Sequence, residues 1–154
     1  MHKISIITVV KNGMPYLEDC LKSFQLQSYP NKEQVVICSN SNDFTIDYLK
    51  NYKKKNVKIF FDNKSTNKFE ALNIGIDSCS GDIIGILHAD DIFYSKDTLN
   101  LISKNLQEND IVYGNILISN RKNILFIKRF WKSSSFNSKK LSYGWMLPHT
   151  SIFF

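Results

Sequence analysis

The first strand-like segment of the sequence is apolar on both of its faces. Residues Ile4–Val10 are almost all β-branched, so a strand here would be buried on both sides. Strands of that kind occur in parallel sheets that are covered by helices on both faces. The turn-forming residues Asn12 and Gly13 follow, and Pro15 stands at an expected first helical position. The chain is therefore expected to begin with the strand, turn and helix of an α/β fold.

Strand-like runs and amphipathic helices continue to alternate as far as residue 87. The further strands are expected at Val35–Cys38, Val57–Phe61 and Ile83–Leu87. Asn67 and Glu70 form a capping-box pattern ahead of the helix that leads into the last of them. This order predicts a mostly parallel central sheet with helices on both faces, in which ligands bind beyond the carboxyl ends of the strands.

The last third of the sequence departs from this alternation. After a helix with apolar residues at Leu99 and Ile102, Ile111–Ile118 and Ile124–Phe130 are expected to pair as a C-terminal hairpin added to the sheet. Residues 131–143 are polar and rich in serine and lysine, which indicates a surface loop, and residues 150–154 have the character of a final strand. With no internal repeat, residues 1–154 are expected to form a single domain.

The positive charge is concentrated in the C-terminal part. The net charge is +6, and residues 111–154 contain 7 Lys and Arg side chains but no Asp or Glu. A basic segment can face nucleic acid, an anionic membrane or a phosphorylated substrate, or it can be a solvated surface. Strand alternation accounts for Phe126 and Phe130 as apolar positions, so no nucleic-acid partner is expected.

The sequence also carries information on the location of the protein and on its cysteines. No apolar run approaches the roughly 20 residues of a membrane-spanning helix, and no signal-peptide pattern is present at the start. We therefore expect a cytoplasmic protein, with its basic segment at the inner face of the membrane as one interpretation of the charge. Cys20, Cys38 and Cys79 have neither disulfide nor zinc-site spacing and are interpreted as small buried residues.

The strongest chemical signal is His88-Ala89-Asp90-Asp91, directly after the expected strand Ile83–Leu87. Two adjacent carboxylates at the carboxyl end of a strand provide the oxygen ligands that a hard divalent cation prefers. The alternative is that the pair caps the next helix. Ser95 lies directly ahead of that helix and is better placed to cap it, which leaves the carboxylates available for a ligand.

Four segments together resemble a known family. They are Ser5–Asn12, Ala71–Ile76 with Ser80–Ile84, His88–Asp91, and Gly144-Trp145-Met146-Leu147-Pro148-His149. In this order they look like the signatures of family 2 glycosyltransferases of the GT-A fold, a Rossmann-like α/β architecture, and the last is similar to a motif of members that build bacterial surface polysaccharides.

The resemblance implies a metal-dependent transferase that moves a sugar from a nucleotide-diphosphate donor to a polysaccharide or lipid-linked acceptor. Asp91 and Asp90 would hold Mg²⁺ or Mn²⁺, and Asp90 would also contact the ribose. The remaining donor-binding residues implied by the resemblance are Thr8, Val9, Lys11, Asn12, Ser39 and Asn73. Glu70 and His149 are the candidate catalytic groups, although Glu70 is explained equally well as a capping residue.

The sequence also departs from the family pattern. Cys38 and Ser39 stand where the family commonly has aspartates, one of which recognises the base, and His88 stands where a further aspartate is frequent. Inverting transfer needs a carboxylate to deprotonate the acceptor, yet no acid follows Asp110. We therefore expect a domain that is incomplete at its C-terminus and impaired in transfer. The alternative is a catalytically inactive nucleotide-sugar-binding module that acts with a partner.

Overall fold

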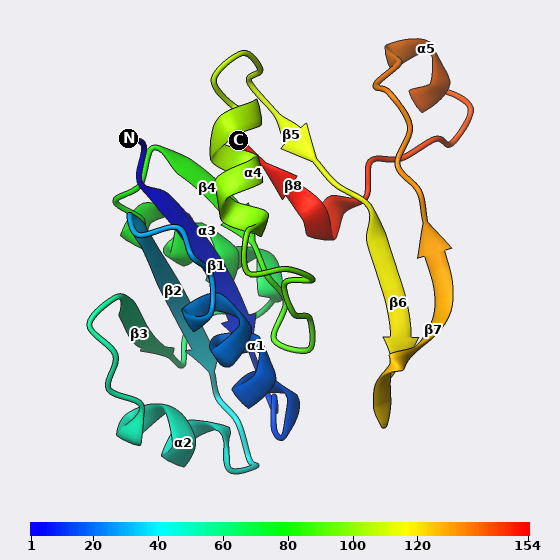
Figure 1. Cartoon of the computed structure of the whole chain (residues 1–154). Coiled ribbons are helices and arrows are strands. Elements are labelled where there is room, and N and C mark those ends of the chain that lie inside the picture. Colours follow the sequence, from blue (N-terminus) through cyan, green and yellow to red (C-terminus); the bar gives the residue numbers. More distant parts are fainter.

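The computed structural model describes all 154 residues and has one main sheet of six strands in the order β3-β2-β1-β4-β8-β5 (Figure 1). The strands are β1 (Ile4–Val10), β2 (Lys32–Ser39), β3 (Val57–Asp62), β4 (Ile83–Ile86), β5 (Val112–Tyr113) and β8 (Ile152–Phe153). β1 to β4 are mutually parallel, and β8 is antiparallel to its neighbours β4 and β5. The expected mostly parallel α/β sheet is confirmed, and the carboxyl ends of β1 to β4 share one edge.

Helices cover both faces of this sheet. α1 (Tyr16–Gln25), α2 (Thr45–Asn51) and α4 (Thr98–Asn105) pack on one face, and α3 (Lys68–Ser78) covers the other. Figure 1 shows α1 in front of the strands and α3 behind them. The continuous apolar character of β1 follows from this arrangement, because alternate residues of the strand contact helices on opposite faces.

α3 packs closely against the centre of the sheet at Gly75. A Cβ atom added at Gly75 would lie 2.5 Å from Cγ2 of Ile7, so this position has room only for glycine. Ala71, one helical turn earlier, is fully buried against Val35 and Ile37. The small residues on this face of α3 therefore set the distance between the helix and the sheet.

Glu33 anchors the amino edge of the sheet, opposite the site described below. Its side chain is 4% exposed and contacts two ammonium groups, Lys3 Nζ at 2.8 Å and Lys58 Nζ at 3.1 Å. It also accepts hydrogen bonds from the Ser5 hydroxyl and the Ser80 backbone N–H, both at 2.7 Å. Burial alone would raise the pKa of Glu33, but these donors outweigh it and lower the pKa to about 2.

The C-terminal part differs from the expectation in detail. The expected hairpin is present as β6 (Ile116–Asn120) and β7 (Asn123–Trp131), but it forms a separate two-stranded sheet. The expected single strand 111–118 is divided at Gly114, whose N–H donates to the Ser151 carbonyl oxygen at 3.3 Å. Of the expected strand, only β5 joins the main sheet, where it pairs with β8 at the edge. The chain then turns away from the main sheet into the hairpin.

Two short helices accompany this segment. α5 (Ser138–Leu141) interrupts the expected surface loop, and the 3-10 helix η1 (His149–Ser151) leads into β8. In Figure 1 the hairpin and α5 stand apart from the main sheet. None of the helices combines the length and the apolar composition that crossing a bilayer requires.

Candidate donor and metal site

The carboxyl edge of the sheet carries the loops that follow β1, β2, β3 and β4. The loop after β1 turns at Asn12, which has a left-handed backbone with φ 53°, a conformation that asparagine tolerates better than most residues. The Asn12 N–H donates to the Ser41 hydroxyl at 3.0 Å, and the Asn12 side-chain oxygen accepts from the Asn42 N–H at 2.9 Å. The loops after β1 and β2 are therefore held together as one unit.

Asp43 strengthens the same connection between these loops. Its carboxylate accepts hydrogen bonds from the Met14 N–H at 3.1 Å and the Thr45 N–H at 3.0 Å. Although desolvation opposes it, these bonds lower the pKa of Asp43. Asp43 thus fixes the position of the loop after β1 relative to the start of α2.

The loop after β4 presents the two carboxylates. The Leu87 N–H donates to the Ile7 carbonyl oxygen at 3.0 Å, and the Asp91 N–H donates to the His88 carbonyl oxygen at 3.0 Å, which closes a turn. Asp90 is exposed, whereas Asp91 is half-buried. Burial, and then the neighbouring charge of Asp90, raises the pKa of Asp91. The pair therefore concentrates negative charge at a position where a cation would be stabilising.

The donor set fits a divalent cation that is shared with a substrate. No group of three or more His, Cys, Asp and Glu side chains is arranged to hold a metal by itself. Mg²⁺ is typically bound through one or two carboxylates together with substrate phosphates and water, so two aspartates are sufficient for a site of this kind. Asp90 and Asp91 are hard oxygen ligands in adjacent positions, as that arrangement requires.

Arg121 was missed by sequence reasoning and contacts this pair. It lies in the turn between β6 and β7, and its Nη2 donates to Asp90 Oδ2 at 2.7 Å. Its guanidinium carbon also lies 5.0 Å from the centre of the Tyr16 ring, at the start of α1. No local pattern marks Arg121, because the contact depends on the path of a hairpin that lies 31 residues further along the chain.

The two histidines singled out from the sequence lie near each other. The rings of His88 and His149 have centroids 6.1 Å apart in an edge-to-face arrangement. The His88 carbonyl oxygen accepts from the Cys20 thiol at 3.4 Å, which ties the loop to α1. η1 thus brings His149 beside the loop of the carboxylates, although His149 lies 61 positions after His88 in the sequence.

The remaining donor-binding candidates lie in different environments. Thr8 is fully buried, and its hydroxyl donates to the Leu87 carbonyl oxygen at 2.9 Å, so its side chain is not free for a ligand. Val9 packs toward α3, whereas Lys11 is exposed in the loop after β1. Ser39 ends β2 and its carbonyl oxygen accepts from the Ser41 hydroxyl at 2.9 Å.

Two candidates belong to α3. Asn73 is exposed in the second turn of the helix. Glu70 lies in the first turn and accepts from the Thr66 N–H at 2.7 Å, while the Asn67 side chain accepts from the Phe69 and Glu70 N–H groups at 2.9 and 3.1 Å. The expected Asn67 cap is therefore present, but Glu70 completes it through the Thr66 N–H and the Asn67 side-chain amide rather than through the Asn67 N–H of a regular capping box. The expectation that Ser95 caps the helix after the carboxylates is wrong: the N-cap of α4 is Asp97, which makes no side-chain capping bond, and the Ser95 hydroxyl accepts only from the Asp97 N–H at 3.2 Å.

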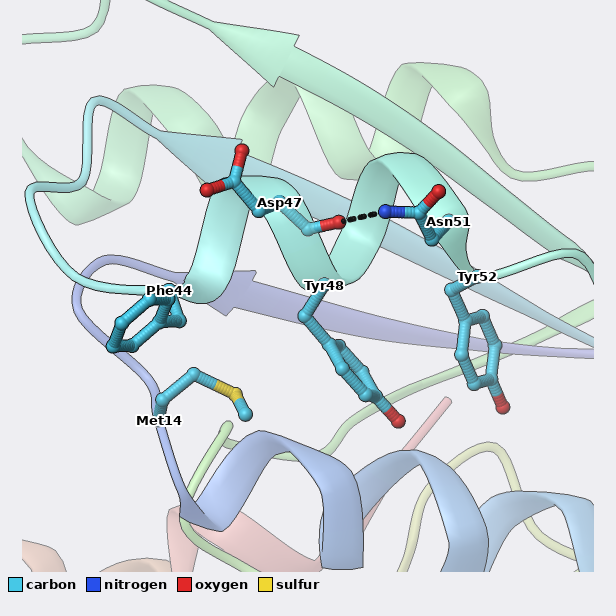
Figure 2. Close-up of a pocket in the computed structure, with 6 residues that line it drawn as sticks. All are labelled: Met14, Phe44, Asp47, Tyr48, Asn51 and Tyr52. Carbon is cyan, nitrogen blue, oxygen red and sulfur yellow. Dashed lines mark hydrogen bonds between the residues drawn. The ribbon is translucent and has the colours of Figure 1, made fainter.

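A groove of about 420 Å³ lies between α1 and α2, away from the carboxylates. Figure 2 shows Tyr48 and Tyr52 pointing from α2 toward α1, with Met14 and Phe44 at one end. The groove has no residue from the loop 88–91, and its single charged lining residue is Asp47. It offers aromatic surface but no group that would neutralise phosphate, so we do not assign the donor site to it.

The parallel strands with an aspartate pair at their carboxyl edge have the GT-A fold. A family model described as glycosyl transferase family 2 matches residues 5–152. The chain belongs to this family.

Curated relatives agree with this assignment. An uncharacterized glycosyltransferase of Haemophilus influenzae is 36% identical over 119 residues, which are 75% of this chain and 47% of that protein. The GalNAc(5)-diNAcBac-PP-undecaprenol beta-1,3-glucosyltransferase of Campylobacter jejuni is 31% identical over 80% of this chain and 41% of its own length. The chain thus spans less than half the length of these relatives.

Solved structures show the same fold. S. aureus TarS 1–349 in complex with UDP-GlcNAc superposes with a TM-score of 0.64 at 25% identity, over 76% of this chain and 34% of that one. A mannosyltransferase of Pyrobaculum calidifontis, solved with GDP-Man and Mn²⁺, has a TM-score of 0.65 at 23% identity, over 80% of this chain and 37% of that one.

Proposed function

We propose that the carboxyl edge of the sheet binds a nucleoside-diphosphate sugar together with Mn²⁺ or Mg²⁺, for transfer of the sugar to a polysaccharide or lipid-linked acceptor. The observation that carries the proposal is that Asp90 and Asp91 lie next to each other in one turn. Asp91 is half-buried, and no lysine or arginine pairs with its carboxylate. Family membership and the UDP-GlcNAc complex of TarS support the choice of donor class.

The residues of this chain have distinct parts in donor binding. Asp90 and Asp91 would hold the cation, which neutralises the developing charge of the leaving diphosphate when it is bound. The last part of β1 would contribute Thr8, and the joined loops after β1 and β2 would present the backbone of Asn12 and the side chain of Lys11 to the nucleotide. Because Asn12 and Asp43 fix these loops by internal hydrogen bonds, the donor would meet a preorganised surface. Val9, Ser39 and Asn73 complete the proposed donor-binding set.

The acceptor proton needs a base if transfer inverts the anomeric configuration. The carboxylates that follow the neighbouring strands already have partners, since Asp43 binds Met14 and Thr45, Asp62 binds Lys64 and Ser65, and Glu70 binds Thr66. None of them is a free carboxylate at this edge. We therefore propose that residues 1–154 form a single domain that binds donor but by itself transfers its sugar inefficiently, with His149 the remaining candidate for contact with the diphosphate or acceptor.

The acceptor side of the proposal rests on charge. The segment after Asp110 contains seven cationic and no acidic side chains, and the hairpin leaves Lys128, Arg129 and Lys132 exposed. The Campylobacter relative acts, by its name, on an undecaprenol-linked glycan. An anionic or lipid-linked acceptor at the inner face of the membrane is consistent with both observations. The proposal therefore includes a cytoplasmic location for the protein.

Donor binding can be tested by calorimetry with UDP-GlcNAc and GDP-mannose in Mn²⁺ or in EDTA. We expect binding only with the cation, because diphosphate beside two carboxylates otherwise meets uncompensated like charge. Asp91→Asn should abolish the binding, whereas Asp77→Asn, an exposed change on α3, should preserve it. Equal affinity in EDTA, or an Asp91→Asn variant that binds normally, would refute the metal site.

The alternative function is that of an inactive module that binds nucleotide sugar and works through a partner. It is favoured by the same observation that Asp43, Asp62 and Glu70 all have hydrogen-bond partners already. Incubation of residues 1–154 with labelled donor and lipid-linked acceptors distinguishes the two. Measurable transfer that Asp91→Asn abolishes would support the enzyme, and cation-dependent binding without any transfer would support the module.

A further inference from the structure

We propose that Arg121 is a donor-responsive latch, which pairs with Asp90 in the free protein and moves to the diphosphate when the cation and donor bind. The inference rests on the proposed function and assigns a second partner to a residue that the sequence did not single out. Its basis is the placement of one guanidinium at the junction of three segments, the β6–β7 turn, the start of α1 and the carboxylate loop.

The contact with Asp90 lies where a metal ligand must be free. Arg121 Nη2 is 2.7 Å from Asp90 Oδ2, and the two side chains are 66% and 48% exposed. A divalent cation bound to Asp90 would place two further positive charges next to the guanidinium, so both cannot occupy that oxygen favourably. The cation and Arg121 are therefore competitors in the absence of diphosphate.

The competition is weak enough for the latch to open. Exposed ion pairs contribute little, because water and salt screen them and two flexible side chains must be ordered. Displacing Arg121 should therefore cost the cation only about two- to fivefold in affinity. The hairpin can accommodate the movement, because β6 and β7 form their own two-stranded sheet rather than extending the main one.

The diphosphate provides the second partner. Phosphates that share a cation with Asp90 and Asp91 lie next to the place from which the guanidinium is displaced, and arginine binds phosphate through two parallel hydrogen bonds. The Tyr16 ring, 5.0 Å from the guanidinium carbon, keeps the side chain at this edge during the exchange. Arg121 thus weakens binding of the cation by itself but strengthens binding of the cation together with the diphosphate.

This dual role predicts effects of opposite sign for a single substitution. In calorimetry with Mn²⁺ alone, Arg121→Gln should bind about two- to fivefold more tightly than the wild type. In titrations of UDP or GDP in saturating Mn²⁺, the same variant should bind about tenfold or more weakly, because charged hydrogen bonds to phosphate are lost. Lys122→Gln is the matched control, since Lys122 is the next residue in the turn and makes no ion pair.

Arg121→Lys separates charge from geometry. It keeps one positive charge at the turn, so Mn²⁺ affinity should stay near the wild-type value, while the loss of bidentate phosphate binding should still weaken UDP or GDP binding. Equal changes in Arg121→Gln and Lys122→Gln would overturn the latch, because they would show an effect of net charge alone. Unchanged affinities in Arg121→Gln alongside normal wild-type binding would overturn the latch and leave the proposed function intact. A wild-type protein that binds neither nucleotide would overturn both.

Discussion

The hydroxyl of Thr8 donates a hydrogen bond to the carbonyl oxygen of Leu87 at 2.9 Å, which ties the centre of β1 to the residue before His88. The same hydroxyl accepts a hydrogen bond from the Gln34 side chain at 3.0 Å, so β2 joins the connection. All three groups lie in the interior, where an unpaired polar atom is costly. The loop of the carboxylates is thereby positioned by the core of the sheet rather than by contacts on the surface.

Thr8→Val should test this connection. Valine has the shape of threonine but no hydroxyl, so the Leu87 carbonyl and the Gln34 amide would both remain buried without their partner. We expect a loss of about 2–4 kcal/mol in the free energy of unfolding, measured with urea. Thr8→Ser keeps the hydroxyl and should lose only about 1 kcal/mol. Equal losses in the two variants would show that the hydrogen bonds are not what holds the loop.

The sequence predicts the parallel strands β1 to β4 well, because the sequence patterns that mark them are local. Ile4–Val10 is apolar on both faces, and the structure has β1 at the same bounds with helices on both sides. The placement of Asp90 and Asp91 at the carboxyl edge follows from their position directly after β4. Parallel strands bring their carboxyl ends together, so the candidate site requires no information about distant contacts.

The hairpin and Arg121 could not be predicted in this way. Alternation identifies β6 and β7 as a pair, but it does not specify which sheet they join. That choice depends on the pairing of β5 with β8, whose residues are about 40 positions apart along the chain. The Asp90 contact of Arg121 depends in turn on where the hairpin points, so a lone arginine in a polar turn carries no local signal.

Gly75→Ala should weaken the packing of α3 on the sheet. Alanine is the better helix former by about 1 kcal/mol, but its Cβ would lie 2.5 Å from Ile7 Cγ2, inside van der Waals contact. Overpacking of this kind costs about 1–3 kcal/mol, so we expect a net decrease in thermal stability. Gly114→Ala is the control, because its added Cβ would have no neighbour within 4 Å. A Gly75→Ala protein that melts higher than the wild type would contradict the close approach.

Acid should destabilise the fold partly through Glu33. The pKa of Glu33 is lowered from 4.5 to about 2 by its donors. A depressed carboxyl pKa stabilises the folded state above the unfolded pKa and loses this effect as the pH falls through the folded value. Glu33 should therefore contribute roughly 3 kcal/mol near pH 7, lost between about pH 4.5 and pH 2.

The Glu33→Gln variant isolates this contribution from that of the other carboxylates. The difference in unfolding free energy between wild type and variant should be largest above pH 5 and should narrow steadily below it. Urea titrations at a series of pH values measure both curves. A difference that stays constant from pH 7 to pH 2 would show that the Glu33 charge does not stabilise the amino edge.

Glu70 can be assigned as a capping residue or as a base by separating stability from chemistry. As a cap, its replacement by glutamine should lower the melting temperature slightly and leave donor binding and donor hydrolysis unchanged. Asn67→Ala, which removes the side chain that accepts from Phe69 and Glu70, should cost about 1 kcal/mol in stability by the same mechanism. Loss of hydrolysis in Glu70→Gln without any change in melting would identify Glu70 as the base instead.

The exposed basic hairpin should bind anionic membranes. β7 is exposed at every residue from Asn123 to Phe130, and the apolar Leu125 and Phe126 are 87% and 59% exposed beside Lys128 and Arg129. Basic residues near an anionic surface contribute about 1 kcal/mol each, and adjacent aromatic and aliphatic groups add apolar burial. We expect sedimentation with vesicles that contain phosphatidylserine, with binding that weakens as salt increases.

A charge-matched pair of variants makes this expectation specific to the hairpin. Neutralising Lys128, Arg129 and Lys132 removes three charges from the proposed surface, whereas neutralising Lys53, Lys54 and Lys55 removes three exposed charges after α2. The first variant should lose most of its vesicle binding and the second should retain it, because the proposed membrane contact is made by the hairpin, where Leu125 is 87% exposed. Equal losses would show that binding follows net charge alone, and the basic segment would then be a solvated face without a membrane role.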